Sequence, residues 1–269
     1  MAEKTPGIRP SEFEGEWITV KLGSVTRRVG EFFKNLDLLI WRRTRKLEKL
    51  QALKASMLEK MFPKDGADVP EVRFREFTGP WKRGRLSSYL ETSTEKNVQN
   101  AFAREDALSV SGESGIVNQI QHMGRSYAGA AVSNYGIVRL GDVVYTKSPL
   151  RDAPFGIIKT NMGNPGIVSA LYAVYHPKAA VHPPFVQTYF ESNSRLNNYL
   201  RPIISKGAKN TINIGDDDAL SGEVIFPEYD EQAAICNYFQ TLGQLIFLTT
   251  RELEKLQSIK KALLEKMFV

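Results

Sequence analysis

Few side chains in this sequence have types and spacing that could support catalysis. The one cysteine, Cys236, and the three histidines, His122, His176 and His182, lie far apart and form no ligand cluster, so a structural zinc site is not expected. The sequence contains no Walker A motif for a nucleoside triphosphate and no Gly-x-Ser-x-Gly elbow for a serine nucleophile. We therefore expect no metal and no catalytic cofactor on this chain.

One segment, His182-Pro-Pro-Phe185, is close to a catalytic motif. It resembles the Asn/Asp-Pro-Pro-Tyr/Phe loop whose first residue accepts a hydrogen bond from the target amine in amino-methyltransferases. Neither a suitable first residue nor a Gly-rich loop for S-adenosylmethionine is present. We favour a helix that begins with proline. The alternative, a stand-alone methyltransferase, requires that the isolated chain bind S-adenosylmethionine.

Polar and basic side chains on predicted turns suit contact with nucleic acid. Lys and Arg bind phosphates, whereas Arg, Asn and Gln can read base edges in the major groove. One such turn, Tyr145–Arg151, follows a strand-like run, and another, Ser205–Asn213, contains a glycine. Ordinary solvated loops are the alternative interpretation. The candidate DNA-binding residues are Lys147, Ser148, Arg151, Lys206, Lys209, Asn210, Asn213 and Arg125.

Length and composition are those of a globular chain with one large or two modest domains. The 269 residues are 42% hydrophobic and 25% charged, and no stretch of 18 apolar residues could span a bilayer. The N-terminus shows no targeting pattern, and a single cysteine suits a reducing compartment. We expect a cytoplasmic protein that does not enter a membrane.

The net charge of +6 is concentrated in two short segments. Residues 41–60 carry seven Lys/Arg against two Glu, and residues 247–266 carry five Lys/Arg against three Glu. The remaining residues are close to neutral. A polyanionic partner is therefore compatible with these two segments above all.

These two basic segments are copies of one sequence. A shift of 206 residues aligns residues 33–62 with 239–268, and 17 of the 30 positions are identical. Apolar residues recur in each copy at spacings of three and four, as expected for a long amphipathic helix with a narrow seam. Because such a helix needs a partner, we expect the two copies to pack against each other. The predicted interface residues are Leu36, Ile40, Leu47, Leu50, Leu53, Met57, Met61, Leu242, Ile246, Leu253, Leu256, Ile259, Leu263 and Met267.

A shorter repeat appears at a shift of 64 residues. Phe13-Glu-Gly-Glu-Trp17 and Phe77-Thr-Gly-Pro-Trp81 are both followed by Leu five residues after the Trp. The second copy opens a long region, whereas the first runs almost at once into the helix. The N-terminus thus looks like the beginning of a domain without its body.

The region between the helices, residues 70–227, has the pattern of a strand-rich domain. Short runs of β-branched and aromatic residues are bounded by Gly, Asn, Pro and Asp, and helical patterning is clearest over 184–199. The predicted strands are 135–140, 142–145, 166–175 and 223–226. The expected fold class is α+β: one mixed, strand-rich globular domain with two long antiparallel, coiled-coil-like helices.

Several motifs in order resemble the specificity (S) subunit of type I restriction-modification systems. In that family a target-recognition domain opens with Phe-x-Gly-x-Trp-x-x-x-x-Leu, here Phe77–Leu86, and ends in Pro followed by an acidic-Gln-x-x-Ile helix start, here Pro227–Ile235. A long helix then closes on a Leu-x-Lys-Met-Phe-like sequence, here Glu252–Phe268. Lys46–Pro63, followed by Val69–Phe77, is similar to the family's central spacer.

The resemblance implies four segments. Residues 1–30 are the remnant of a first recognition domain, 31–63 the first spacer helix, 64–227 the one complete recognition domain, and 228–269 the second spacer helix. A full-length S subunit has two recognition domains, so the chain resembles a half S subunit.

The resemblance also implies a non-catalytic role in phage defence. S subunits read double-stranded DNA and dock modification subunits, which supply S-adenosylmethionine and adenine methylation. Restriction subunits, where present, supply ATP- and Mg-dependent translocation and cleavage. A two-fold homodimer would restore two DNA readers and predicts a symmetric bipartite target. The alternative from another class is a helical scaffold or regulator that binds modification subunits without reading DNA.

Overall fold

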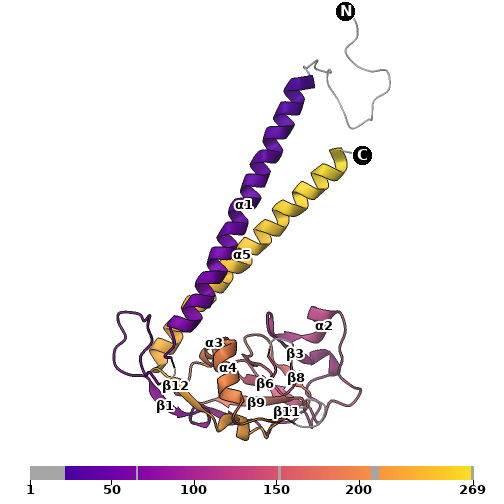
Figure 1. Ribbon diagram of the computed structural model, residues 1–269. Helices are drawn as coiled ribbons and strands as arrows, with labels where there is room; N and C mark the ends of the chain where they lie inside the picture. Colours follow the sequence, from indigo (N-terminus) through magenta and orange to yellow (C-terminus); the bar gives the residue numbers. More distant parts are fainter. Residues whose placement is uncertain (1–21, 65, 151–152, 207–211, 268–269) are drawn as a thin grey trace, which may run out of the picture. The chain divides into compact units, whose positions relative to one another are not determined.

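The computed structural model describes all residues except 1–21, 65, 151–152, 207–211 and 268–269. The chain divides into two compact units (Figure 1). The helix-pair unit contains residues up to 51 together with those from 244, and the globular unit contains residues 52–243. Two long helices, α1 (Leu22–Lys60) and α5 (Tyr229–Met267), each contribute to both units. The predicted α+β fold with two long helices is confirmed.

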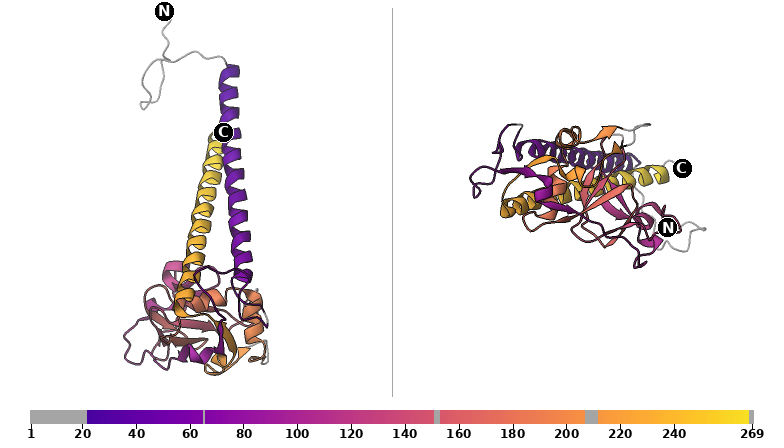
Figure 2. Two further views of the ribbon diagram at one scale, coloured as in Figure 1. Left: turned by 90° about the vertical axis from the view of Figure 1, so that its left-hand side faces the viewer. Right: turned by 90° about the horizontal axis from the view of Figure 1, so that it is seen from below.

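In the helix-pair unit, α1 and α5 lie side by side and antiparallel (Figure 2). Arg43 Nε of α1 lies 2.9 Å from Glu252 Oε2, and Lys260 Nζ of α5 lies 2.5 Å from Asp37 Oδ1. Position numbers fall along one helix as they rise along the other, which requires the antiparallel direction. Because these pairs are largely exposed, they fix register more than they stabilise.

The residues of the predicted apolar seam differ in burial along α1 and α5. Leu36 and Leu242 are buried, and Leu53 and Ile259 are 42% and 40% exposed. The side chain of Met267 lies outside the described side chains. Met61 is buried in the globular unit, where Met57 packs against the same core. The other predicted seam residues are half-buried: Ile40, Leu47, Leu50, Ile246, Leu253, Leu256 and Leu263.

The globular unit is built from short antiparallel strands. Its largest sheet has four strands in the order β2-β9-β6-β7, and the other strands pair in twos as β1-β12, β3-β4, β5-β8 and β10-β11. The bounds are β1 Lys82–Arg85, β2 Leu90–Thr92, β3 Leu108–Ser111, β4 Gly115–Asn118, β5 Gly136–Val138, β6 Val143–Thr146, β7 Ile158–Thr160, β8 Gly166–Val168, β9 Tyr172–Pro177, β10 Ser205–Lys206, β11 Ile212–Asn213 and β12 Glu223–Phe226.

Short helices connect these strands. They are η1 Leu86–Ser88, η2 Arg104–Asp106, α2 Gln119–Met123, α3 Pro183–Tyr189, α4 Asn193–Leu200 and η4 Asp218–Leu220.

Two predicted elements are each divided in the structure. The predicted strand 166–175 becomes β8 and β9, because the chain turns between them and Tyr172 N donates to Ser169 O. The predicted helix 184–199 becomes α3 and α4, because Ser192 caps α4 and its hydroxyl also donates to Glu59. In both places, a hydrogen bond to a turn or to a side chain replaces a backbone hydrogen bond that a continuous strand or helix would make.

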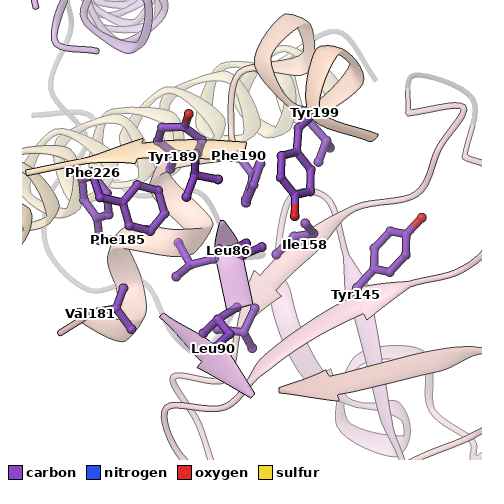
Figure 3. Close-up of a cluster of buried hydrophobic side chains, with 14 of the residues drawn as sticks. Leu86, Leu90, Tyr145, Ile158, Val181, Phe185, Tyr189, Phe190, Tyr199 and Phe226 are labelled. Atoms are coloured by element: carbon purple, nitrogen blue, oxygen red, sulfur yellow. The ribbon is translucent and has the colours of Figure 1, made fainter. Parts of the chain in front are cut away.

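The core lies between the four-stranded sheet and α3 (Figure 3). Phe185 and Leu90 are almost fully buried, and ring contacts join Phe185 to Phe226 and Tyr189. Tyr145 is also buried, and its hydroxyl donates to Phe155 O at 2.7 Å. Because burial disfavours the phenolate, it raises the pKa of Tyr145 and keeps this donor protonated.

The first Met-Phe repeat anchors the end of α1 in this core. Phe62 is 1% exposed, and its ring contacts Trp81, Phe185 and Phe239. The Arg195 guanidinium lies 4.3 Å from the ring centroid of Phe62. The Met-Phe and Phe-x-Gly-x-Trp motifs therefore meet in one aromatic cluster of the globular unit.

The acidic-Gln-x-x-Ile motif supplies a network of buried polar side chains at the start of α5. Arg73 binds Glu231 in a two-point ion pair, with Nε–Oε1 at 2.7 Å and Nη2–Oε2 at 2.8 Å, and also donates to Gly79 O. Gln232 is completely buried, accepts from His182 N and donates to Pro227 O. The motif thus holds the start of α5 to the segments on either side of it.

Candidate nucleic-acid interface

The first predicted DNA-contacting turn begins at the end of β6. Lys147 is the residue after that strand, and its Nζ lies 2.7 Å from Asp216 Oδ1. Its side chain is 19% exposed, so the ammonium is partly sheltered and its charge is offset by the carboxylate. Ser148 is half-buried beside it, and Arg151 lies outside the described residues.

The second predicted turn is the connection of a small hairpin. Strand β10 ends at Lys206, whose side chain is not among those described, and β11 ends at the exposed Asn213. Lys209 and Asn210 lie outside the described residues. Because Asp216 follows β11 by three residues, its ion pair with Lys147 brings the two predicted turns to one place. We call Lys147, Ser148 and Asn213 the Lys147 surface.

Acidic residues border the Lys147 surface, which the sequence interpretation missed. Asp216 and Asp217 lie three and four residues after β11, and Thr92 Oγ1 donates to Asp217. Tyr175 OH donates to Asp216 O at 3.0 Å, and burial raises the pKa of Tyr175 so that it remains a donor. A DNA phosphate approaching Lys147 must therefore compete with Asp216. The run Asp216-Asp217-Asp218 was the available signal.

The candidate Arg125 follows Gly124, the residue that ends α2. Asn118 caps the start of α2, and Gly124, at φ +75°, ends it in a left-handed turn that suits glycine. The Arg125 guanidinium lies 4.7 Å from the ring centroid of Tyr127, which is 59% exposed. Ser126 Oγ donates to Arg104 O at 2.7 Å, which brings a second arginine close.

We call Arg104, Arg125 and Tyr127 the Arg125 surface. An exposed ring beside a guanidinium can stack on a base while the arginine contacts a phosphate or a base edge. The sequence signal for Tyr127 was its position two residues after Arg125 on a turn, a pairing of basic and aromatic residues.

The His182-Pro-Pro-Phe185 segment begins α3, as the proline pattern predicted. His182 is the N-cap, and its backbone N donates to Gln232 Oε1. Phe185 is fully buried, so its ring cannot stack on an extruded base. Partial burial lowers the pKa of His182, which favours the neutral imidazole. The segment therefore serves the packing of α3 and the start of α5.

The described part of the chain offers neither a metal site nor a membrane-spanning helix. No group of three or more His, Cys, Asp or Glu residues there is placed to hold a metal ion. The same residues include no helix that is both long and apolar enough to cross a membrane. Cys236 is buried, and burial raises its thiol pKa to about 12.

No family model matches the sequence, and neither does any curated protein. Solved structures do match the fold. The crystal structure of the HsdS subunit from Thermoanaerobacter tengcongensis aligns with a TM-score of 0.57 at 17% identity, over 91% of this chain and 57% of that chain. A chain from a study of complex assembly and conformational transition of the type I R-M system aligns with a TM-score of 0.53 at 15% identity, over 90% and 57%.

The present chain spans a little over half the length of these solved chains. At such low identity the likeness establishes the fold. The resemblance inferred from the motifs is confirmed at that level: over nine-tenths of its length, this chain has the fold of type I HsdS subunits.

Proposed function

We propose that this chain is a DNA-specificity subunit of a type I restriction-modification complex and is itself non-catalytic. The observation that carries the proposal is the HsdS-like fold over about nine-tenths of the chain. The motifs that suggested the family also have structural roles, because Phe62 packs on Trp81 and Glu231 pairs with Arg73. In this proposal the chain acts in the cytoplasm and reads double-stranded DNA.

The proposed DNA-reading element is the recognition domain, residues 64–227, which lies within the globular unit. The Lys147 surface and the Arg125 surface offer side chains that can contact phosphates and base edges. The proposal assigns residues 31–63 and 228–269 to the spacer and residues 1–30 to a remnant of another recognition domain. Most of that remnant lies outside the described residues, and its last nine residues are the first turns of α1.

The proposed partners bind chiefly to the helix pair. Trp41, Phe247 and Leu248 are 58%, 59% and 57% exposed, which is unusual for large apolar side chains and suits a protein contact. Modification subunits would supply S-adenosylmethionine and methylation, and restriction subunits would supply ATP- and Mg-dependent cleavage. This chain would hold none of these cofactors.

We also propose that the chain acts as a two-fold homodimer. In these 269 residues the helix sequence occurs twice and the strand-rich unit once, so two copies bring two readers together. The expected target is bipartite and symmetric, with one half-site per chain. A monomer at micromolar concentration in analytical ultracentrifugation, or an asymmetric methylated motif, would contradict the homodimer.

The decisive experiment is methylome sequencing of cells that express this chain with its modification subunit. We expect one bipartite adenine-methylated motif that disappears when this chain is omitted. An electrophoretic mobility shift assay with and without the modification subunit should show preference for that motif over a scrambled duplex. Methylation that does not depend on this chain would overturn the proposed function.

The second candidate function is a scaffold that binds modification subunits without reading DNA. The specific observation in its favour is that the charge of Lys147 is already balanced by Asp216, beside further acidic residues. Under this alternative, the mobility shift shows no sequence preference in either condition, while the modification subunit still binds.

A further inference from the structure

The globular unit contains a pocket that the proposed DNA recognition does not use. Its volume is about 670 Å³, within the range of sites for small molecules. It is open to solvent on one side and is lined by the β3–β4 turn, β7, α3 and the parts of α1 and α5 that belong to this unit. The side chains that matter for its chemistry are Lys54, Glu113, Lys159, Gln187, Glu191 and Phe239.

A buried lysine stands in the wall of this pocket. Lys159 is the middle residue of β7, and Ile158 before it points into the hydrophobic core (Figure 3). Because successive side chains in a strand point to opposite faces, Lys159 points to the other face, toward the pocket. Lys159 is only 8% exposed. Among the described residues, no hydrogen bond or ion pair within 4.0 Å engages its ammonium.

Two carboxylates, Glu113 and Glu191, line the pocket with Lys54 and Lys159, but neither forms an ion pair with Lys159. Glu191 attracts it, but Glu191 Oε1 already lies 2.6 Å from Lys54 Nζ, and both of those side chains are 28% exposed. The Lys54 ammonium pairs with this carboxylate, and the Lys159 ammonium has only its longer-range attraction. Burial lowers the pKa of Lys159, which shows how unfavourable the unpaired charge is at this place. An added anion would complete the pairing.

The other walls of the pocket suit an organic anion. Gln187 Oε1 accepts from Thr160 N at 3.1 Å, which orients the Gln187 side chain at the pocket wall. Met162 and Phe239 add apolar surface beside the polar groups. The stiff backbone of a DNA duplex cannot enter a pocket of this size to reach a side chain that is 8% exposed. The pocket therefore suits a small molecule better than a DNA duplex.

We propose that this pocket binds a small molecule through a phosphate or carboxylate group that pairs with Lys159, beside the Lys54–Glu191 ion pair. Such a charge-assisted contact in a sheltered site is strong enough to fix the orientation of a ligand. The proposal is independent of DNA recognition, because neither the Lys147 surface nor the Arg125 surface lines the pocket.

Isothermal titration calorimetry on the full chain tests this proposal with three probes: inorganic phosphate, adenosine monophosphate and citrate. At least one probe should bind, and the one that binds best identifies the oxyanion. Lys159→Met should reduce its affinity about tenfold or more, as loss of a charged hydrogen bond in a sheltered site predicts. The exposed Lys96→Met is the matched control and should bind like the unaltered chain.

A second variant keeps the test valid if Lys159→Met does not fold. Lys54→Met frees Glu191 to pair with Lys159. It should therefore also lower the affinity for the probe. Absence of binding by all three probes, or equal binding by the unaltered chain and a folded Lys159→Met, overturns the proposal. Displacement of the bound probe by a short DNA duplex also overturns it, because the occupant would then not be a small molecule.

Discussion

At the scale of single residues, the buried ion pair between Arg73 and Glu231 is the most sensitive point of the fold. The Glu231 side chain is 2% exposed, so removing its partner leaves a carboxylate without compensation. We expect Arg73→Met to lower the free energy of unfolding by about 3–5 kcal/mol. Urea denaturation followed by circular dichroism measures this change.

The matched control for that prediction is an exposed pair. Arg43 and Glu252 have side chains that are 40% and 55% exposed, so Arg43→Met should change the free energy of unfolding by about 1 kcal/mol or less. The double variant Arg73→Met/Glu231→Met should be more stable than Arg73→Met alone, because no unpaired charge remains. An unchanged urea midpoint for Arg73→Met would show that the pair does not hold the start of α5.

A second residue-scale prediction concerns Lys159 and pH. Burial lowers its pKa from the ordinary value of 10.5, so the unfolded chain binds more protons between the lowered pKa and 10.5. Stability should therefore rise with pH in that window, relative to Lys159→Met, by up to about 1.4 kcal/mol per pH unit. Glu191 and Lys54 face the group. Cys236, with a pKa of about 12, stays neutral there.

Urea denaturation at several pH values between 7 and 10.5 checks this prediction. The difference in free energy of unfolding between the two proteins should be largest at the lower pH values and should shrink as pH rises. A difference that does not vary with pH would mean that Lys159 keeps its ordinary pKa. Adding an anion that binds the pocket should weaken the dependence, because it stabilises the charged lysine.

At the scale of elements, the long helix α5 contains one weak position, Gly243. An added Cβ there meets no heavy atom within 4 Å, and the backbone is not in the left-handed region. Gly243→Ala should stabilise the protein by about 0.5–1 kcal/mol, because alanine loses less backbone entropy in a helix. Thermal unfolding followed by circular dichroism measures this gain.

Gly156 is the contrasting control for that measurement. It lies at φ +85°, and an added Cβ would collide with the backbone oxygen of Thr146. Gly156→Ala should therefore destabilise the globular unit by more than about 1 kcal/mol. If Gly243→Ala were also destabilising, the α5 helix would need flexibility at that point rather than tolerate it.

The long helices were predictable from the sequence because a repeated seam extends over many turns. The division of α3 from α4 was not, because it depends on Ser192, whose hydroxyl bonds to Glu59 on a segment far away in the sequence. The pairing of Lys147 with Asp216 was also not predictable, because these two residues lie far apart in the sequence. Local patterns place basic residues on turns, but only the fold shows which of them are already neutralised.

At the scale of the whole molecule, basic charge is separated from the proposed reading surfaces. Residues 41–60 and 247–266 carry the excess of Lys/Arg, whereas Asp216, Asp217 and Asp218 border the Lys147 surface. If the chain reads DNA, the helices should supply attraction that is independent of sequence, and the globular unit should supply the preference for sequence. These two contributions respond differently to salt and can be separated.

Neutralising one basic face of α1 tests that division of roles. Arg42, Lys46 and Lys49 are exposed and share one helix face at spacings of four and three. In the complex with a modification subunit, changing all three to Gln should lower the affinity for the target duplex and for the scrambled duplex equally. The slope of log affinity against log salt should fall by about 0.9 for each lost phosphate contact.

The contrasting variant is Arg125→Gln in the globular unit. It should reduce the preference for the target duplex over the scrambled duplex by about 1–3 kcal/mol, with little change in the salt slope. Fluorescence anisotropy at several salt concentrations measures both effects, and a triple variant that loses only target binding would place sequence reading on the helix instead.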